Sequence, residues 1–230
     1  MIRILPTGAP TGYAHLISAG ATFASLSSNP AIRQALWSQQ GGRCAYCECR
    51  LKDPSSPNHN TRIEHFHPQS SGHWNSRCAH QCRLKVGENS KAPIAWGNLL
   101  LCCDGQQAAG VDFTCDKSKA NTHICADFVN PKVWSSPRLL EIDRSGVALA
   151  VSGLPLNATN VINNILCLNA PHLIKARKTV HDANLRVIRR QGAMGAALTP
   201  SRRQQIRSAL RTSAQTSEYS ATLLSLADRF

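Results

Sequence analysis

The sequence is poor in aromatic and in acidic side chains. Phe, Trp and Tyr make up 5% of the 230 residues, and 13 Asp and Glu stand against 26 Lys and Arg. So few aromatics predict a core built mainly of Leu, Ile, Val and Ala. The shortage of acids leaves a formal charge of +13, which favours a polyanionic partner, because Lys and Arg displace counterions from phosphates. The alternative is a basic protein that its charge merely keeps soluble.

Long hydrophobic runs are also missing. No apolar stretch approaches the roughly 20 residues needed to cross a bilayer. Pro6, Gly8, Pro10 and Gly12 interrupt the segment in which a secretory signal would need an apolar run. We therefore expect a cytoplasmic protein that does not associate with membranes. Its ten cysteines would then stay reduced and serve as metal ligands. A disulfide-rich secreted domain is the alternative, which counting free thiols would test.

Composition divides the chain into three regions. Residues 1–43 are predicted to form a helical lead-in, with a helix that begins at Pro30, is capped by Asn29 and ends at Gly41. Residues 44–125 contain most of the cysteines and histidines and are rich in loops. Residues 126–230 are predicted to be mostly helical. Their last 60 residues hold eleven Lys and Arg against three acids, which favours contact with a partner or nucleic acid, a solvated helix face being the alternative.

The third region should contain a hairpin and two amphipathic helices. Residues 139–142 and 147–151 have strand-like composition and flank a turn-forming segment. One helix is expected from Pro171 to near Gly192, and another after Pro200. The first is predicted to bury one face, made up of Leu173, Ala176, Val180, Ala183 and Val187. The second is expected to bury Ile206 and Leu210, with Leu223 and Leu224 further on.

Four cysteines form a candidate zinc site. Cys44 and Cys47 are separated by two residues, which lets both thiolates reach one tetrahedral ion. Such a half-site needs a second pair, for which we predict Cys103 at the end of an apolar run and Cys115 eleven intervening residues later. Cys102 is an alternative to Cys103. Half-buried reduced thiols without metal are the alternative to the site as a whole.

The remaining thiols carry less information. Cys78 and Cys82 lie with His80 in a polar insertion over residues 69–97. A second zinc site there and a set of loose thiols both remain open. The other cysteines are predicted to be packing residues, namely Cys49, Cys125 and Cys167.

An acidic residue and a histidine adjoin at the end of a short strand-like run. Glu64 and His65 would point to opposite faces of a strand unless a turn follows at once, and Pro68 supplies that turn. His65 can then take a proton from water, and Glu64 can bind a hard divalent cation. Asp116 offers a second carboxylate, held rigidly because it adjoins Cys115.

Two further residues complete the candidate site. The Asn98 amide is expected to lock the loop that carries His65; a turn Asn before a strand is the alternative. Lys119 lies one helical turn after Cys115, where its ammonium could meet a phosphate. An exposed lysine without that role is the alternative.

Together these residues resemble the HNH nuclease motif of the ββα-metal fold. The resemblance is carried by the cysteine pair, the Glu64-His65 dipeptide, the five-residue step from Asn98 to Cys103, and the Cys115-Asp116-x2-Lys119 close. Asp116 departs from the pattern, since many relatives have His or Asn there, and the loop from Cys103 to Cys115 is long. Between about Pro30 and Arg190 the chain is also similar to the PtuB-type nucleases of the Septu anti-phage defence system.

This resemblance implies an α+β protein with a small zinc-stapled ββα-metal core over residues 44–125, flanking helices and a helical C-terminal region. It implies a metal-dependent endonuclease that hydrolyses phosphodiester bonds and works with an ABC-type, PtuA-like ATPase. His65, Asn98 and Asp116 are then the predicted catalytic residues. Glu64 and Asp116 would hold Mg²⁺ or Mn²⁺, Arg62 and Lys119 would contact nucleic acid, and Zn²⁺ would be structural on Cys44, Cys47, Cys103 and Cys115.

DNA is the expected substrate, and RNA stays an alternative. An alternative interpretation retains the zinc site but not the catalytic activity. In it the chain is a zinc-stabilised nucleic-acid-binding or scaffold module with an inactive HNH site. Dependence on Mg²⁺ or Mn²⁺ beyond zinc separates the two readings, because only the enzyme needs the second metal.

Overall fold

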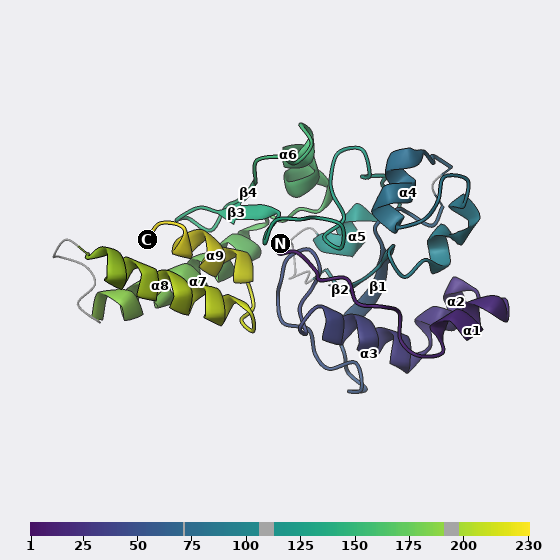
Figure 1. The fold of residues 1–230 in the computed structure, drawn as a ribbon, viewed down its shortest axis with the longest axis horizontal. Helices are drawn as coiled ribbons and strands as arrows, with labels where there is room; N and C mark the ends of the chain where they lie inside the picture. Colours follow the sequence, from purple (N-terminus) through teal and green to yellow (C-terminus); the bar gives the residue numbers. More distant parts are fainter. Residues whose placement is uncertain (71, 106–112, 191–197) are drawn as a thin grey trace.

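A computed structural model describes residues 1–70, 72–105, 113–190 and 198–230 and shows an α+β protein with two small antiparallel sheets. The β1–β2 sheet lies toward one end of the molecule with α1–α4, helices α7–α9 lie at the other end, and β3–β4 lies between them (Figure 1). The elements are α1 (Tyr13–Ser18), α2 (Phe23–Ser27), α3 (Pro30–Gln39), β1 (Thr61–His65), α4 (Ser76–Cys82), η1 (Asn89–Ile94), β2 (Leu99–Cys103), α5 (Cys115–Lys119), β3 (Leu140–Ile142), β4 (Ala148–Ala150), α6 (Ala158–Asn160), η2 (Val161–Ile165), α7 (Pro171–Arg190), α8 (Pro200–Ala214) and α9 (Ser220–Ala227).

The predicted helix at Pro30 is confirmed. Helix α3 begins at Pro30, and the side-chain oxygen of Asn29 accepts a hydrogen bond from Ala31 N at 2.9 Å. This satisfies one of the amides that have no partner in the first turn of a helix. Gln40 follows as the C-cap, and the chain turns at Gly41 and Gly42, both with positive φ.

Strand β2 is the best buried strand of the molecule. All five of its residues are buried, and β1 pairs with it so that Glu64 lies opposite Leu100. Along its other edge, Leu101 exchanges two hydrogen bonds with the Gln40 side chain, and its carbonyl also accepts from Ala45 N. A side chain and a loop thus satisfy the open edge of β2. Helices α3 and α5 both pack against this strand.

The predicted hairpin is present as β3 and β4, which pair antiparallel with Leu140 opposite Ala150. The Asp143 carboxylate closes the turn by accepting from Ser145 N and Val147 N at 2.8 and 2.9 Å. Gly146 has a φ of +94°, and a Cβ there would collide with the Ile174 carbonyl of α7. Glycine therefore allows α7 to approach the hairpin closely.

Helix α7 begins at Pro171 as predicted, and residues 191–197, which include the expected end at Gly192, lie outside the described residues. The predicted face is buried at Leu173 and packs against the core at Ala176 and Val180, but the prediction is wrong at its C-terminal end. Val187 is 53% exposed, whereas Ile188 is buried together with Arg177 and His181. Arg177 turns inward because its guanidinium donates to the Gly146 carbonyl at 2.9 Å and to the Leu168 carbonyl.

Helices α8 and α9 form a second apolar core with the end of α7. Its buried members are Ile188, Ile206, Leu210, Ala214, Leu223, Leu226 and Ala227. The predicted Ile206, Leu210 and Leu223 belong to it, and Leu224 packs at its edge. Arg43 ties this bundle to the rest of the molecule by donating to the Ala214 and Ser217 carbonyls at 3.0 Å each. In the described part of the chain, no helix combines the length and apolar character needed to cross a membrane.

Candidate functional site

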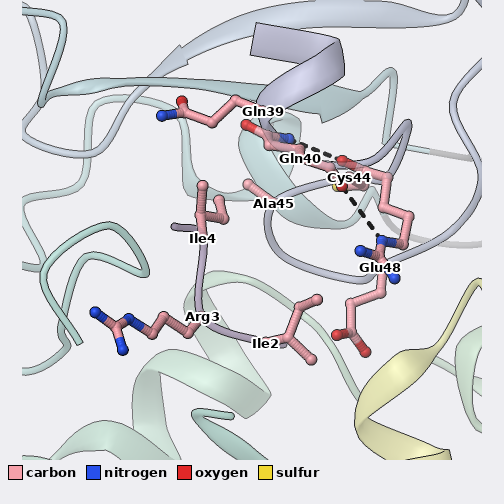
Figure 2. Close-up of a pocket in the computed structure, with 9 residues that line it drawn as sticks. Ile2, Arg3, Ile4, Gln39, Gln40, Cys44, Ala45 and Glu48 are labelled. Atoms are coloured by element: carbon pink, nitrogen blue, oxygen red, sulfur yellow. Dashed lines mark hydrogen bonds between the residues drawn. The ribbon is translucent and has the colours of Figure 1, made fainter. Parts of the chain in front are cut away.

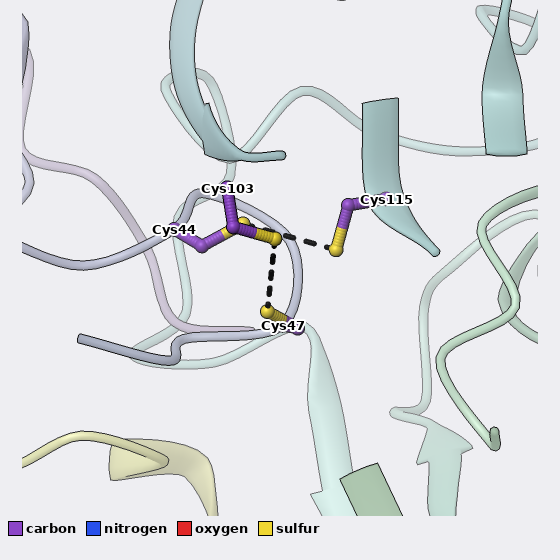
Figure 3. A group of neighbouring side chains, drawn as sticks. All are labelled: Cys44, Cys47, Cys103 and Cys115. Atoms are coloured by element: carbon purple, nitrogen blue, oxygen red, sulfur yellow. Dashed lines mark hydrogen bonds between the residues drawn. The ribbon is translucent and has the colours of Figure 1, made fainter. Parts of the chain in front are cut away.

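The four cysteines predicted as zinc ligands meet at one point (Figure 3). Their sulfurs lie within 4.8 Å of one another, with 3.8 Å between Cys44 and Cys115 and 3.9 Å between Cys47 and Cys103. Sulfurs bound tetrahedrally to one zinc ion are about 3.8 Å apart, because each lies about 2.3 Å from the metal. All ten cysteines of the chain are free thiols. The four-cysteine cluster could therefore hold a metal ion.

Backbone geometry explains why these four thiols converge. The loop after α3 folds back on itself, with Cys44 N donating to the Cys49 carbonyl at 3.0 Å and Glu48 in the left-handed region at φ +66°. Cys103 ends β2 and Cys115 begins α5. The alternative ligand Cys102 is not part of the cluster, because successive side chains of a strand point to opposite faces.

A pocket of about 290 Å³ lies beside this cluster and collects the other predicted residues. It is lined by Glu64 and His65 from the end of β1 and by Asp116 and Lys119 from α5. Arg62 and Phe23 also line it. The pairing of β1 with β2, and the packing of α5 on β2, thus bring two carboxylates and an imidazole to one opening.

The two carboxyl groups of the pocket lie close enough to shift each other's pKa. Glu64 accepts from the Tyr46 hydroxyl at 3.0 Å and pairs with the Lys119 ammonium at 2.8 Å. Burial raises the pKa of Glu64 well above its usual range, and the hydrogen-bonded Asp116 carboxyl adds to the rise. Burial alone would also raise the pKa of Asp116, but hydrogen bonds from Glu64 and Arg62 bring it below its ordinary value. Lys119 and Arg62 therefore balance the charge of the pair, and Glu64 holds a proton more readily than an exposed glutamate does.

His65 is held in one orientation. Its Nε2 lies 2.9 Å from the Pro93 carbonyl, and its ring packs edge-on against Phe23 with 4.1 Å between centroids. A carbonyl only accepts hydrogen bonds, so Nε2 carries the proton and Nδ1 keeps the lone pair. Burial lowers the pKa of His65 despite the hydrogen bond to Pro93. The ring is therefore a neutral base held at the pocket.

Asn98 lies outside the pocket and acts on the loop after β1. Its side chain accepts from His67 N at 2.7 Å and donates to the His67 and Ala92 carbonyls at 3.0 and 2.9 Å. The residue is fully buried. These bonds match the predicted role of locking the loop that carries His65, which is a positioning role, because the amide does not line the pocket.

The structure gives Lys119 a different place from the expected phosphate contact. Its side chain is fully buried, and its ammonium is already bonded to Glu64 and to the His65 carbonyl at 2.9 Å. It fixes two neighbouring residues instead of facing a ligand. Arg62 lies at the rim with its side chain 53% exposed and donates from Nε to Asp116 at 2.6 Å. The outward guanidinium remains available to a bound anion.

A second cluster of metal-ligating side chains includes a residue of the loop after β1, and the sequence had indicated only Cys78 as a possible member. It consists of His67, Cys78, His123 and Cys125. Cys125 was expected to be a packing residue, whereas Cys82 and His80, considered as partners of Cys78, are not part of the cluster. The close spacing of His123 and Cys125 was the only local signal available.

A smaller cavity of about 30 Å³ lies between residues 2–4 and the segment from Gln39 to Glu48 (Figure 2). This volume is about that of one water molecule. It is too small for a substrate, and it is lined by residues of the cysteine loop and of the end of α3.

No protein-family model matches the chain, and neither a curated protein nor a solved structure is significantly similar to it.

Proposed function

We propose that this protein is a metal-dependent endonuclease of the HNH type, which hydrolyses phosphodiester bonds. One observation carries the proposal: Glu64, His65 and Asp116 line a single pocket beside a four-cysteine cluster. Glu64 and His65 end β1, which pairs with β2, and Asp116 lies on α5, which packs against β2; this arrangement supports the ββα-metal resemblance. A hydrolase of this kind needs a base for water and a cation for the phosphate, and the pocket offers groups for both.

The donor set fits a hard divalent cation. Glu64 and Asp116 are adjacent carboxyl groups, and burial together with their proximity raises the pKa of Glu64. A cation between them would remove that conflict, since it stabilises both carboxylates at once. Bound there, Mg²⁺ or Mn²⁺ would neutralise charge on the scissile phosphate. Oxygen ligands suit these ions better than zinc, for which the four thiols form the structural site.

Other residues of the chain would supply proton transfer, positioning and contact with the phosphate backbone. His65 takes the proton of the attacking water on Nδ1, while the Pro93 carbonyl keeps Nε2 protonated and the ring in place. Asn98 fixes the backbone of His67, two residues after His65, by hydrogen bonds to both its N–H and its carbonyl. Lys119 holds Glu64 and the His65 carbonyl in one arrangement. Arg62, at the rim, meets the phosphate backbone.

The excess of Lys and Arg supports nucleic acid as the substrate, with DNA as the proposed form. The resemblance to PtuB-type nucleases supports a place in anti-phage defence together with an ABC-type, PtuA-like ATPase. The basic helices α7 and α8 offer a surface for that partner or for nucleic acid, with exposed Lys175, Arg186, Arg189, Arg203 and Arg211.

Cleavage by a His65 variant tests the proposal. Purified protein is incubated with supercoiled plasmid and with single-stranded RNA, with Mg²⁺ or Mn²⁺ and without either. Wild type should nick one substrate only when the divalent ion is present. His65→Ala should slow nicking by about 10²- to 10⁴-fold, the usual contribution of a general base. His80→Ala is the matched control, since His80 is an exposed histidine on α4 outside the pocket.

Zinc content should be the same in all three proteins. Cleavage by His65→Ala at the wild-type rate would reject the assignment. Nicking that proceeds equally well in a chelator that removes Mg²⁺ would reject the cation site.

A second candidate function is a zinc-stabilised binder with an inactive site. One observation favours it: Glu64 and Asp116 already have Lys119, Tyr46 and Arg62 as partners, so neither carboxyl group needs a cation. Nucleic-acid affinity that is unchanged by Mg²⁺, in a protein that cleaves neither substrate, would support this function instead.

A further inference from the structure

We propose that His67, Cys78, His123 and Cys125 bind a second zinc ion, separate from the four-cysteine site. This set of four residues, called here the mixed cluster, brings two imidazole nitrogens and two sulfurs within 4.8 Å of one another. Three of the four residues are buried and His123 is half-buried. The proposal does not rest on the nuclease function.

The distances suit tetrahedral coordination. Cys125 Sγ lies 3.5 Å from His67 Nδ1, and Cys78 Sγ lies 3.2 Å from His123 Nε2. A sulfur and a nitrogen bound to the same zinc ion are about 3.5 Å apart, given bond lengths of about 2.3 and 2.0 Å. The two imidazole rings are nearly perpendicular, at 85° and 5.3 Å between centroids. His67 faces its sulfur with Nδ1, and His123 faces its sulfur with Nε2.

The donor set selects zinc over the other common ions. Two thiolates and two imidazoles are borderline-soft ligands, and this combination is typical of structural zinc. The mixed cluster contains no carboxylate, so it is unsuited to Mg²⁺ or Ca²⁺, which require oxygen ligands. Trp74 packs edge-on against His67, with 4.9 Å between the ring centroids. A closed, four-ligand site without an open position is the structural type.

The placement of the four ligands gives the ion a mechanical role. His67 follows β1, Cys78 lies on α4, and His123 and Cys125 follow α5. Helix α4 belongs to the insertion, and besides the mixed cluster it is tied to the following chain by Gln81, which accepts two hydrogen bonds from Asn130. A metal ion would therefore link α4 in the insertion to the segment after β1 and to the segment after α5.

The same ion would fix His67 from its side chain while Asn98 fixes it from its backbone. His67 lies two residues after His65. The two constraints together would leave the loop between β1 and α4 little freedom.

Counting zinc in the wild-type protein is the first test. Native mass spectrometry and elemental analysis should find two zinc ions per chain. Zinc-edge X-ray absorption should give an average of about three sulfurs and one nitrogen per zinc, the mean of an all-thiolate site and a site with two thiolates and two imidazoles. A single zinc per chain at saturation, surrounded by sulfur alone, would overturn the proposal without requiring any variant.

A pair of cysteine variants then identifies the site. Cys125→Ser should lower the stoichiometry from two zinc ions to one and speed hydrogen exchange in residues 72–97. Cys82→Ser is the matched control, because Cys82, like Cys125, is buried, but it lies on α4 outside the mixed cluster. It should keep both ions. Two zinc ions in Cys125→Ser, or loss of one in Cys82→Ser with Cys125→Ser unaffected, would contradict the assignment.

Discussion

The two ends of this molecule differ in how many thiols and charged groups their cores contain. Around β1, β2 and α5 the interior holds clustered thiols and charged groups, among them Glu64, Lys119 and Lys132. The buried members of the second core, formed by α7–α9, are all aliphatic. Thiols and charges are costly to bury without a partner, whereas aliphatic burial is favourable by itself. The stability of the first region should therefore depend on metal ions and on pH, and that of the second core mainly on side-chain volume.

Metal removal should give the largest difference between the two regions. A structural zinc site contributes about 10–16 kcal/mol to folding in small domains, comparable to the whole stability of a typical domain. All four tryptophans lie in the first region, at positions 37, 74, 96 and 134. A strong chelator should thus shift tryptophan fluorescence to that of an unfolded chain, while much of the helical circular dichroism from α7–α9 persists.

The control is the same chelator already saturated with zinc, which should change neither signal. Fluorescence that is unaffected after the zinc has been removed would show that the thiol clusters are not structural metal sites. Simultaneous loss of both signals would show that the two regions fold as one unit.

A core truncation in the second region should have an intermediate effect. Leu210→Ala removes a buried side chain of α8 and should lower the free energy of unfolding of the bundle by about 2–5 kcal/mol. Zinc content should stay at the wild-type value. Urea unfolding followed by circular dichroism measures the change, and Leu156→Ala is the control, since Leu156 is 99% exposed. Loss of zinc from Leu210→Ala would break the proposed independence of the two regions.

The smallest effect concerns pH and Lys132. Burial lowers the pKa of Lys132 to about 7, and its ammonium donates to the Trp96 carbonyl at 2.9 Å. The unfolded chain holds that proton up to about pH 10, so it binds more protons than the folded chain above pH 7. Stability should therefore rise with pH, by about 1 kcal/mol between pH 7 and 8. Chemical denaturation across this range, followed by tryptophan fluorescence, measures the slope.

Lys132→Met should remove that part of the pH dependence, because the side chain keeps its bulk and loses its charge. The same slope in the variant as in wild type would mean that Lys132 is not buried as a titrating group.

Local signals in the sequence were sufficient for much of the fold. The helix at Pro30, the hairpin on either side of Asp143 and the start of α7 each depend on a few neighbouring residues, which is why pattern and capping chemistry predicted them. The four-cysteine cluster was also accessible, because Cys44 and Cys47 have a spacing that itself indicates a metal ligand pair.

Features that depend on distant partners were missed. His67 and Cys78 meet His123 and Cys125 only through the tertiary fold, so no local spacing identifies all four ligands. The burial of Arg177 on α7 was missed because hydropathy assigns this residue to solvent, whereas carbonyl acceptors from other segments stabilise it inside. Lys119 was expected at a phosphate for the same reason: the buried Glu64 that pairs with it lies on another element.

The shared cation of Glu64 and Asp116 is the central claim, and Mn²⁺ binding to zinc-loaded protein tests it most directly. Electron paramagnetic resonance of free Mn²⁺ should show one bound ion per chain, displaced by excess Mg²⁺, with zinc content unchanged. Asp116→Ala should abolish that binding, whereas Asp53→Ala, an exposed aspartate outside the pocket, should retain it. Equal Mn²⁺ binding by wild type and Asp116→Ala, or none by either, would contradict the account.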